Sequence, residues 1–230
     1  MAEEEIQLAN VVVIDLGSLY TRIGLAGDVN QIVTPSIIGF SKQGSSSEAC
    51  FLSESDFISQ YADFNLSYPV LRGATGNIAH LELLLEHVYS TLESQQQTNS
   101  SAVREFPVLL SEPPCNSRVN RDCIARLMFE RFGVPALSFE SQPVLALYAA
   151  GLTTGTSVYQ GDSITCVTPI CEGCVFAQQE VRQEYGGREI TGYLMKMQAE
   201  KRNVNYSMLS GERELFRYLK DTMACTAPQE

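Results

Sequence analysis

The chain has 230 residues and a mass of 25.4 kDa; hydrophobic residues make up 44% of it and charged residues 19%. These values exclude a disordered chain, a coiled coil and a collagen-like repeat, and the length allows one large domain or two small ones. The formal net charge is -11, so non-specific nucleic-acid binding is not expected, because contacts to phosphates need clustered Lys and Arg.

Nothing near the N-terminus has the pattern of a targeting segment. The acidic run 3–5 precedes only a short apolar run, whereas a signal peptide begins with basic residues. No stretch approaches the roughly 18 apolar residues of a membrane span. The seven cysteines are an odd number, which favours reduced thiols over a disulfide framework. We therefore expect a protein of the cytoplasm and cytoskeleton, or of the nucleus, without a membrane or nucleic-acid partner.

The first third of the chain is predicted to contain mainly strands. Residues 11–14 form a continuous β-branched run, which is typical of a strand buried on both faces. The segment 20–26 ends at a Gly-Asp pair and completes a hairpin with the first strand. A third strand is expected over 36–40. Residues 41–66 are polar and lack a clear period, which predicts a long excursion or a small subdomain.

Helices and buried strands alternate in the next segment. Five apolar residues between Leu81 and Leu92 have helical spacing and predict an amphipathic helix, followed by a loop over 94–101. The next elements are a strand over 107–110, a helix capped by Ser117 and ended by Gly133, a strand over 136–139 and a helix over 141–150.

After residue 155 the opening pattern is repeated. A strand near 157–159, a turn at 161–163 and a strand over 164–170 match the strand, glycine turn and strand of 11–26. A further strand over 174–178 and helices over about 189–201 and 211–223 complete the chain. Two similar units joined by a helix are expected to form two lobes around a cleft, with the two turns facing each other.

The pair Cys171 and Cys174 has two interpretations. A zinc site would need a second cysteine pair or histidines at suitable spacing, and the two histidines lie far away on the predicted helix near residue 81. The intervening Glu172-Gly173 suits a two-residue hairpin turn. We therefore predict a hairpin.

The two glycine turns carry the chemistry of the predicted cleft. In the first, Asp15 can hold a water molecule on Mg²⁺, Gly17 lets the backbone approach an anion, and Arg22 can reach a phosphate. An ordinary tight hairpin with a solvated Asp is the alternative. The second turn would supply the opposing half of a phosphate clamp. Gln142 could orient an attacking water, or be an ordinary polar residue at a helix N-terminus.

A series of longer motifs follows in order from about residue 11 to about 223. They occupy residues 13–18, 24–28, 34–37, 107–114, 120–121, 128–130, 147–151, 153–155, 169–173, 187–189 and 193–196. In these motifs the sequence resembles actin and the actin-related proteins. Sugar kinases and heat-shock ATPases of the same superfamily share the Asp-x-Gly-Ser turn, but not Leu-Leu-Ser-Glu-Pro-Pro or Tyr-Ala-Ala-Gly.

This resemblance implies an α/β, ribonuclease H-like fold of the actin ATPase type, with two lobes around a nucleotide cleft. The first lobe would span 1–150, with a small outer subdomain at about 41–66. The second would span 151–230 and be incomplete, because the segment that completes it in actin does not follow Glu230.

The resemblance also implies the site residues and the cofactor, which would be ATP or ADP with Mg²⁺. The metal would be held through water by Asp15, by Gln142 and by an aspartate on the second turn. Gln142 would also be the catalytic residue that orients the attacking water. The other expected contacts are Gly17, Ser18 and Arg22 to the phosphates, Gly161, Asp162 and Ser163 opposite them, and Arg217, Lys220 and Asp221 beside the nucleoside.

Three positions depart from the family pattern. Tyr159 stands where actin has an Asp, Cys166 where it has a His, and Leu16 where it has an Asn. A tyrosine cannot replace an anionic acceptor near Mg²⁺ at neutral pH, because its ordinary pKa is about 10. We therefore expect weak or no hydrolysis.

The leading hypothesis is an actin-related protein that acts as a structural or interaction component of the cytoskeleton. Its partners would be actin, other actin-related proteins or an actin-containing complex. The first alternative is an active actin-type protein that hydrolyses ATP and polymerises. A minor alternative is a small-molecule phosphotransferase of the same superfamily, which would need a general-base carboxylate facing a substrate pocket.

Overall fold

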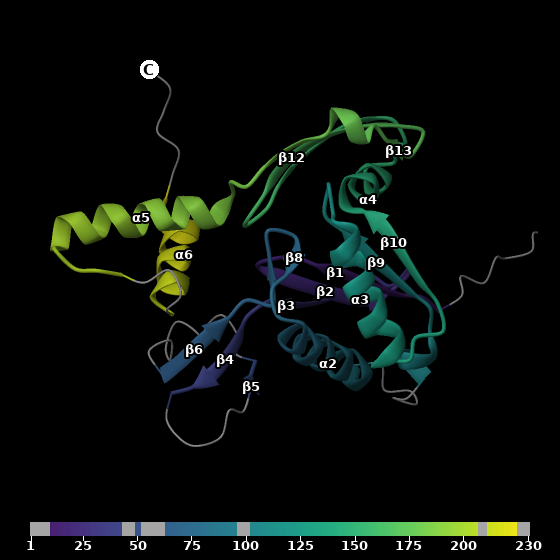
Figure 1. Ribbon diagram of the computed structural model, residues 1–230, viewed down its shortest axis with the longest axis horizontal. Coiled ribbons are helices and arrows are strands. Elements are labelled where there is room, and N and C mark those ends of the chain that lie inside the picture. Colours follow the sequence, from purple (N-terminus) through teal and green to yellow (C-terminus); the bar gives the residue numbers. More distant parts are fainter. Residues whose placement is uncertain (1–9, 43–48, 52–62, 96–101, 207–210, 225–230) are drawn as a thin grey trace, which may run out of the picture.

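A central five-stranded sheet organises the first half of the chain (Figure 1). We describe residues 10–42, 49–51, 63–95, 102–206 and 211–224 of a computed structural model. The strands, in spatial order, are β10 (Leu137–Ser141), β9 (Val108–Glu112), β1 (Val12–Leu16), β2 (Tyr20–Leu25) and β3 (Ile32–Pro35). β1 pairs antiparallel with β2 and parallel with β9, and β10 is parallel with β9. The carboxyl ends of β1, β9 and β10 therefore meet at one edge of the sheet.

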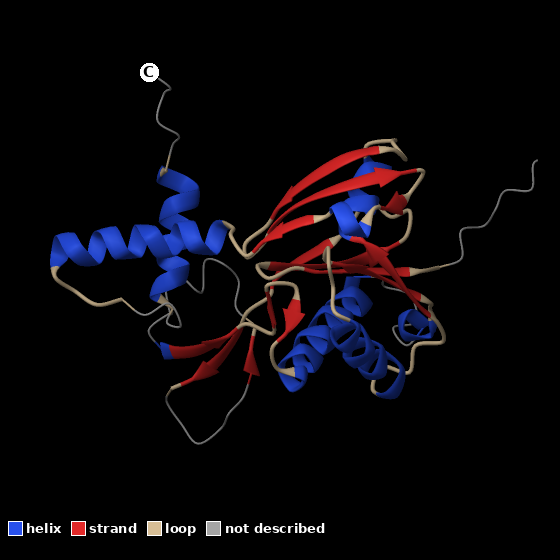
Figure 2. Cartoon of the chain, turned by 45° about the horizontal axis from the view of Figure 1, so that its top comes forward, coloured by secondary structure: helices blue, strands red, loops and turns tan. Residues whose placement is uncertain are grey.

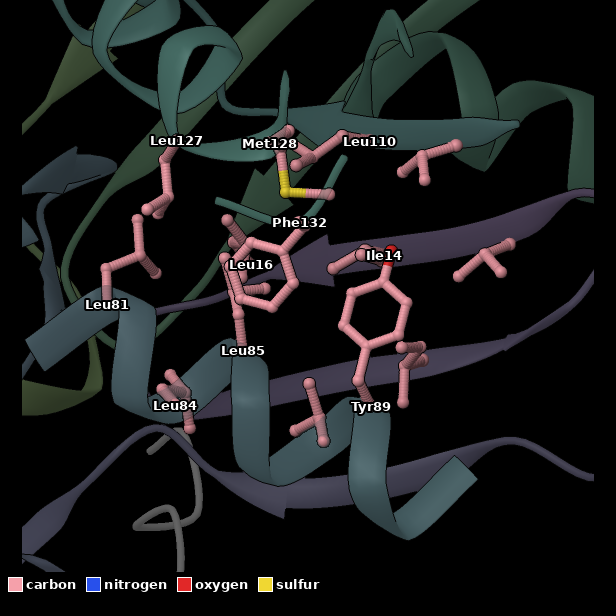
Figure 3. Close-up of a cluster of buried hydrophobic side chains, with 14 of the residues drawn as sticks. Ile14, Leu16, Leu81, Leu84, Leu85, Tyr89, Leu110, Leu127, Met128 and Phe132 are labelled. Carbon is pink, nitrogen blue, oxygen red and sulfur yellow. The ribbon is translucent and has the colours of Figure 1, made fainter. Parts of the chain in front are cut away.

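Two helices cover one face of this sheet and form the main core with it. They are α2 (Ile78–Gln95) and α3 (Arg118–Glu130), whose bounds are close to those expected from their apolar spacing. Figure 3 shows Leu85 and Tyr89 of α2 pointing toward Leu16 and Ile14 of β1, with Phe132 from the segment after α3 beside them. All are buried. The predicted cap of α3 is confirmed, because the Ser117 hydroxyl accepts from the Asn120 N–H at 3.1 Å.

A second sheet lies beyond the other face of the central sheet. It contains β11 (Gly155–Gln160), β12 (Thr165–Cys171), β13 (Cys174–Val175) and β14 (Val181–Gln183), and the short helix η3 (Ala177–Gln179) precedes β14. The helix α4 (Gln142–Ala149) lies between the sheets, and its buried Val144 and Leu147 pack with Ile170 of β12. The strand expected over 174–178 is wrong in its length, because β13 ends at Val175.

The predicted hairpin at Cys171 and Cys174 is confirmed. These residues pair across β12 and β13, and Glu172 and Gly173 have φ angles of 50° and 76°. Two successive positive φ angles are the geometry of a type I′ turn, which matches the twist of the flanking strands.

The strand predicted over 36–40 is confirmed in part, because residues 38–40 belong to β4 (Ile38–Ser41). It pairs with β5 (Ala49–Cys50) and β6 (Phe64–Ser67) in a separate sheet, and β3 of the central sheet was missed. The chain leaves the central sheet at Ser36, whose buried hydroxyl is 2.8 Å from that of Thr21. Part of the predicted excursion over 41–66 lies outside the described residues.

The remaining elements are short strands and two long helices. A two-stranded sheet consists of β7 (Val70–Leu71) and β8 (Ala74–Thr75), and a short helix, η2 (Ala102–Glu105), precedes β9. The last helices are α5 (Gly187–Arg202) and α6 (Glu212–Met223), which cross each other in Figure 2. Within the described ranges, no helix combines the length and the apolar character needed to span a membrane.

The chain therefore has a mixed α/β architecture, as expected from the sequence. The strands of the central sheet come from residues 12–141, and those of the second sheet come from 155–183. In the first unit β1, β2 and β3 precede α2, and in the second β11, β12 and β14 precede α5. The division into lobes at residue 150 stays a prediction.

Candidate functional site

Residues of both glycine turns line one pocket of about 360 Å³. The first turn contributes Gly17, Ser18 and Leu19, and the second contributes Gln160, Gly161 and Asp162. The flanking strands add Asp15, Tyr20, Arg22 and Tyr159, while the helices add Gly187, Lys220 and Asp221. The structure thus brings together most of the predicted site residues, which lie up to about 200 positions apart in the sequence. Gln142, Ser163 and Arg217 do not line the pocket.

The first turn needs glycine because the chain passes very close to itself. The Gly17 N–H donates to the Tyr20 carbonyl at 3.1 Å, and a Cβ atom on Gly17 would lie only 2.6 Å from that oxygen. Real Cβ atoms essentially never approach so closely, and the obstacle is backbone. Gly17 therefore sets the path of the turn that faces the pocket.

Replacing Gly17 with Ala is expected to destabilise the chain by about 1–3 kcal/mol, because the turn must open to admit the methyl group. Urea denaturation followed by circular dichroism measures this change. Gly24→Ala is the matched control in the same hairpin, because a Cβ atom there would make only ordinary contacts, the nearest at 3.6 Å. Equal stabilities for the two variants would contradict the account of the turn.

Asp15 lies at the end of β1, where three donors converge on its carboxylate. In the register of the sheet Asp15 is opposite both Arg22 and Ser111, and Gln142 follows directly after β10. Its Oδ1 accepts from the Ser111 hydroxyl and, at 2.9 Å, from Gln142 Nε2. Its Oδ2 accepts from Arg22 Nη1 at 3.1 Å. Ser111 was missed by the sequence analysis, although its place at the end of a buried parallel strand was a usable signal.

Gln142 lies next to this cluster rather than in the pocket. Its amide nitrogen is committed to Asp15, and its buried Oε1 has no hydrogen-bond partner among the described residues. A buried acceptor without a partner costs free energy, so it favours a donor such as an ordered water at this point.

The second turn is held by α5 and by a buried arginine. The N–H groups of Gly187 and Arg188 donate to the carbonyls of Gly161 and Asp162 at 3.1 and 2.7 Å. Both carboxylate oxygens of Asp162 accept from Arg213 Nη2, at 3.1 and 3.2 Å. Ser163 is buried, and its hydroxyl donates to Asp162; its contact to a phosphate stays a prediction.

Arg213 belongs to a buried cluster that sequence reasoning missed. Its Nη1 donates to Glu214 Oε1 at 2.7 Å, and the same oxygen accepts from the Tyr68 hydroxyl at 3.1 Å. The guanidinium carbons of Arg188 and Arg213 lie 4.6 and 5.0 Å from the centroid of the Tyr68 ring. Burial, followed by the charge of Glu214, raises the pKa of Tyr68 to about 12. The cluster joins the segment between β6 and β7 to α5 and α6.

Three residues of α6 were predicted to lie beside a nucleoside. Lys220 and Asp221 line the pocket, and Lys220 Nζ donates to the Gly187 carbonyl at 3.2 Å. Arg217 is buried behind them and donates to Glu214 and Asp221, at 2.8 and 3.2 Å. Arg217 therefore orients Asp221 instead of facing the pocket itself.

Tyr159 brings a phenol to the second turn. A Cβ atom on Gly161 would lie 2.9 Å from the Tyr159 hydroxyl oxygen, so the phenol packs directly against this glycine. Burial raises the pKa of Tyr159, and the negative charge of Asp15 raises it further. The hydroxyl is therefore protonated at neutral pH and can donate a hydrogen bond into the pocket.

The lining of the pocket suits phosphate groups. Arg22 and Lys220 supply positive charge, Tyr159 supplies a hydroxyl donor, and the glycine turns allow close approach of the backbone. The volume is within the range of small-molecule sites, near its lower end.

The Mg²⁺ that the family resemblance implies does not fit this set of donors. Every carboxylate oxygen of Asp15, Asp162 and Asp221 already accepts from, or is paired with, a donor of the chain. Among the described residues, no group of three or more His, Cys, Asp or Glu side chains is placed to hold a metal ion. Asp15 was predicted to hold the metal through water, but both of its carboxylate oxygens already accept hydrogen bonds from the chain.

Comparison with known proteins identifies what the chain is similar to. The sequence model of the family described as Actin matches residues 6–212. An actin-like protein of Neurospora crassa is 32% identical over 222 residues, which cover 94% of this chain and 56% of the relative. Centractin of Schizosaccharomyces pombe is 34% identical over 214 residues, which cover 90% of this chain and 54% of the relative. The chain thus spans slightly more than half the length of the curated relatives it matches.

Proposed function

The chain belongs to the actin family, and on this premise we propose that it is a structural or interaction component of the cytoskeleton that binds ATP or ADP in the pocket between its two turns, with weak or no hydrolysis. The observation that carries the proposal is that Arg22, Lys220 and both glycine turns line one pocket. A polyphosphate chain needs this combination of cations and close backbone approach.

The weakness of hydrolysis rests on the groups around the pocket. The Gln142 amide nitrogen donates to Asp15 and Ser111, and the residue does not line the pocket. Cys166 is buried, and burial raises the pKa of its thiol, so it is neither a base nor a strong hydrogen-bond partner for water. Mg²⁺, where bound, would neutralise phosphate charge. The carboxylates of Asp15, Asp162 and Asp221 are already paired with donors of the chain.

Lys220→Ala is expected to lower the affinity for ADP and ATP by about 10–100-fold, because a charge-assisted hydrogen bond contributes about 1.5–3 kcal/mol. Isothermal titration with each nucleotide measures the affinity. Lys196→Ala is the matched control, because it removes the same charge from an exposed position of α5 that does not line the pocket. Equal affinities for both variants and the parent chain would place any nucleotide elsewhere.

An ATP-hydrolysing, polymerising protein is the second candidate. The contact between Gln142 and Asp15 favours it, and so does the unpartnered Gln142 Oε1, which could hold a water molecule. Phosphate release and sedimentation under polymerising salt distinguish the two candidates. Appreciable phosphate release together with a pelleted fraction would replace the first proposal with the second.

We further propose that the partners are actin, other actin-related proteins or an actin-containing complex, in the cytoplasm or the nucleus. Family membership supports this class of partner. Large apolar side chains on the second sheet and on α5 are also exposed, including Val158, Val181 and Tyr193. Exposed apolar side chains of this size suit contact with another protein.

A further inference from the structure

We propose that the pocket binds its nucleoside di- or triphosphate without a divalent cation, and that Tyr159 determines this preference. The inference rests on the proposed function, because it concerns the form in which the nucleotide binds. It departs from what the family resemblance implies, and it follows from the donors and acceptors that line the pocket.

The three carboxylates that line the pocket are already paired with arginines. Asp15 accepts from Arg22, Asp162 accepts from Arg213, and Asp221 accepts from Arg217. Mg²⁺ binds through oxygen ligands in near-ideal octahedral geometry, and it needs carboxylates or waters oriented by them. A carboxylate that is already paired with an arginine presents less negative potential to a second cation than an unpaired one.

The two cations that line the pocket lie beside its carboxylates. Arg22 Nη1 lies 3.1 Å from the Asp15 carboxylate, and Lys220 Nζ lies 3.3 Å from that of Asp221. A divalent cation at either carboxylate would therefore stand next to a positive charge that is already there. A phosphate group that contacts Arg22 and Lys220 would instead be attracted by both, and it would compete with Asp15 and Asp221 for them.

Tyr159 brings a hydroxyl group to the pocket. The Tyr159 hydroxyl lies against Gly161 in the second turn, and Tyr159 lines the pocket. Because the pKa of Tyr159 is raised, the hydroxyl is a neutral hydrogen-bond donor. A neutral O–H group can donate to a phosphate oxygen, whereas it offers a cation only a weak lone pair. The side chain thus supplies a hydrogen bond to the anion at the place where a second carboxylate would have favoured the metal.

The test compares nucleotide affinity with and without metal in the full chain. Titrations with ADP and ATP are made once in excess EDTA and once in excess MgCl₂, for the parent chain, Tyr159→Phe and Tyr159→Asp. Because excess Mg²⁺ complexes free nucleotide, a pocket that takes the metal-free form is expected to bind ADP and ATP at least about threefold more tightly in EDTA than in MgCl₂. Tyr159→Phe should bind about 2–10-fold more weakly in both, because one hydrogen bond is lost. Tyr159→Asp should bind at least about tenfold better with Mg²⁺ than with EDTA.

The outcomes separate the inference from the proposed function. Parent-chain affinity that is equal in the two buffers, or lower in EDTA, overturns the inference and leaves nucleotide binding in place. The inference is also wrong if Tyr159→Asp keeps the parent chain's preference for metal-free nucleotide while remaining folded by circular dichroism. Absence of binding by the parent chain in both buffers overturns the proposed nucleotide site and the inference together.

Discussion

Replacing Arg213 with Ala is expected to lower the free energy of unfolding by about 3–5 kcal/mol, because it leaves buried carboxylates without their partner. The Arg213 side chain is 0% exposed, and those of Asp162 and Glu214, which both accept from it, are each 2% exposed. Removing the guanidinium also removes one of the two cations stacked on the Tyr68 ring. Urea denaturation measures the loss.

Arg118→Ala is the matched control for this variant. Arg118 also pairs with an aspartate, Asp122, at 3.8 Å, but the two side chains are 92% and 65% exposed. Exposed pairs contribute about 0–1 kcal/mol, so this variant should unfold close to the parent chain. Tyr68→Phe should lie between the two, because it removes a single hydrogen bond to Glu214. A loss below about 1 kcal/mol for Arg213→Ala would contradict the structural role of the cluster.

Leu85→Ala is expected to destabilise the chain by about 3–5 kcal/mol, through lost apolar transfer free energy and the cavity that the shorter side chain leaves. Leu85 is 0% exposed, and it lies between α2 and the central sheet (Figure 3). Chemical denaturation with guanidinium chloride, followed by circular dichroism, measures the change.

Leu83→Ala provides the control on the same helix. It makes the same chemical change two residues away, where the side chain is 39% exposed. The expected loss is therefore much smaller, and the gain in helix propensity is the same for both variants. If Leu83→Ala cost as much as Leu85→Ala, α2 would not present to the sheet the face that the structure assigns to it.

The cluster around Arg213 also has a consequence for the pocket. Arg213 holds Asp162 of the second turn. Through Glu214, the cluster also connects Tyr68, which lies between β6 and β7, to α6, the helix that carries Lys220. The second turn therefore depends on a residue from the first half of the chain. A nucleotide that binds between the turns would be expected to stabilise this arrangement by mass action.

Local patterns predicted the parts of the fold whose causes lie within a few residues. The apolar spacing of Leu81 to Leu92 predicted α2, Ser117 predicted the start of α3, and Glu172-Gly173 predicted the turn between β12 and β13. The prediction of a single strand at 36–40 found β4 but missed β3, which ends at Pro35. Pairing with β2 places β3 in the central sheet, and the Ser36 hydroxyl lies beside that of Thr21, which is 15 residues away.

The candidate site was predicted in part for the same reason. The sequence by itself determined the two glycine turns and the charged residues near them, because turn chemistry and strand periodicity are local. Only the tertiary structure decided that Ser111 reaches Asp15, that Arg213 holds Asp162, and that Ser163 and Arg217 are buried outside the pocket lining. These pairings join residues that are 51 to 96 positions apart. They depend on strand register and helix packing, which arise only when the whole core is buried.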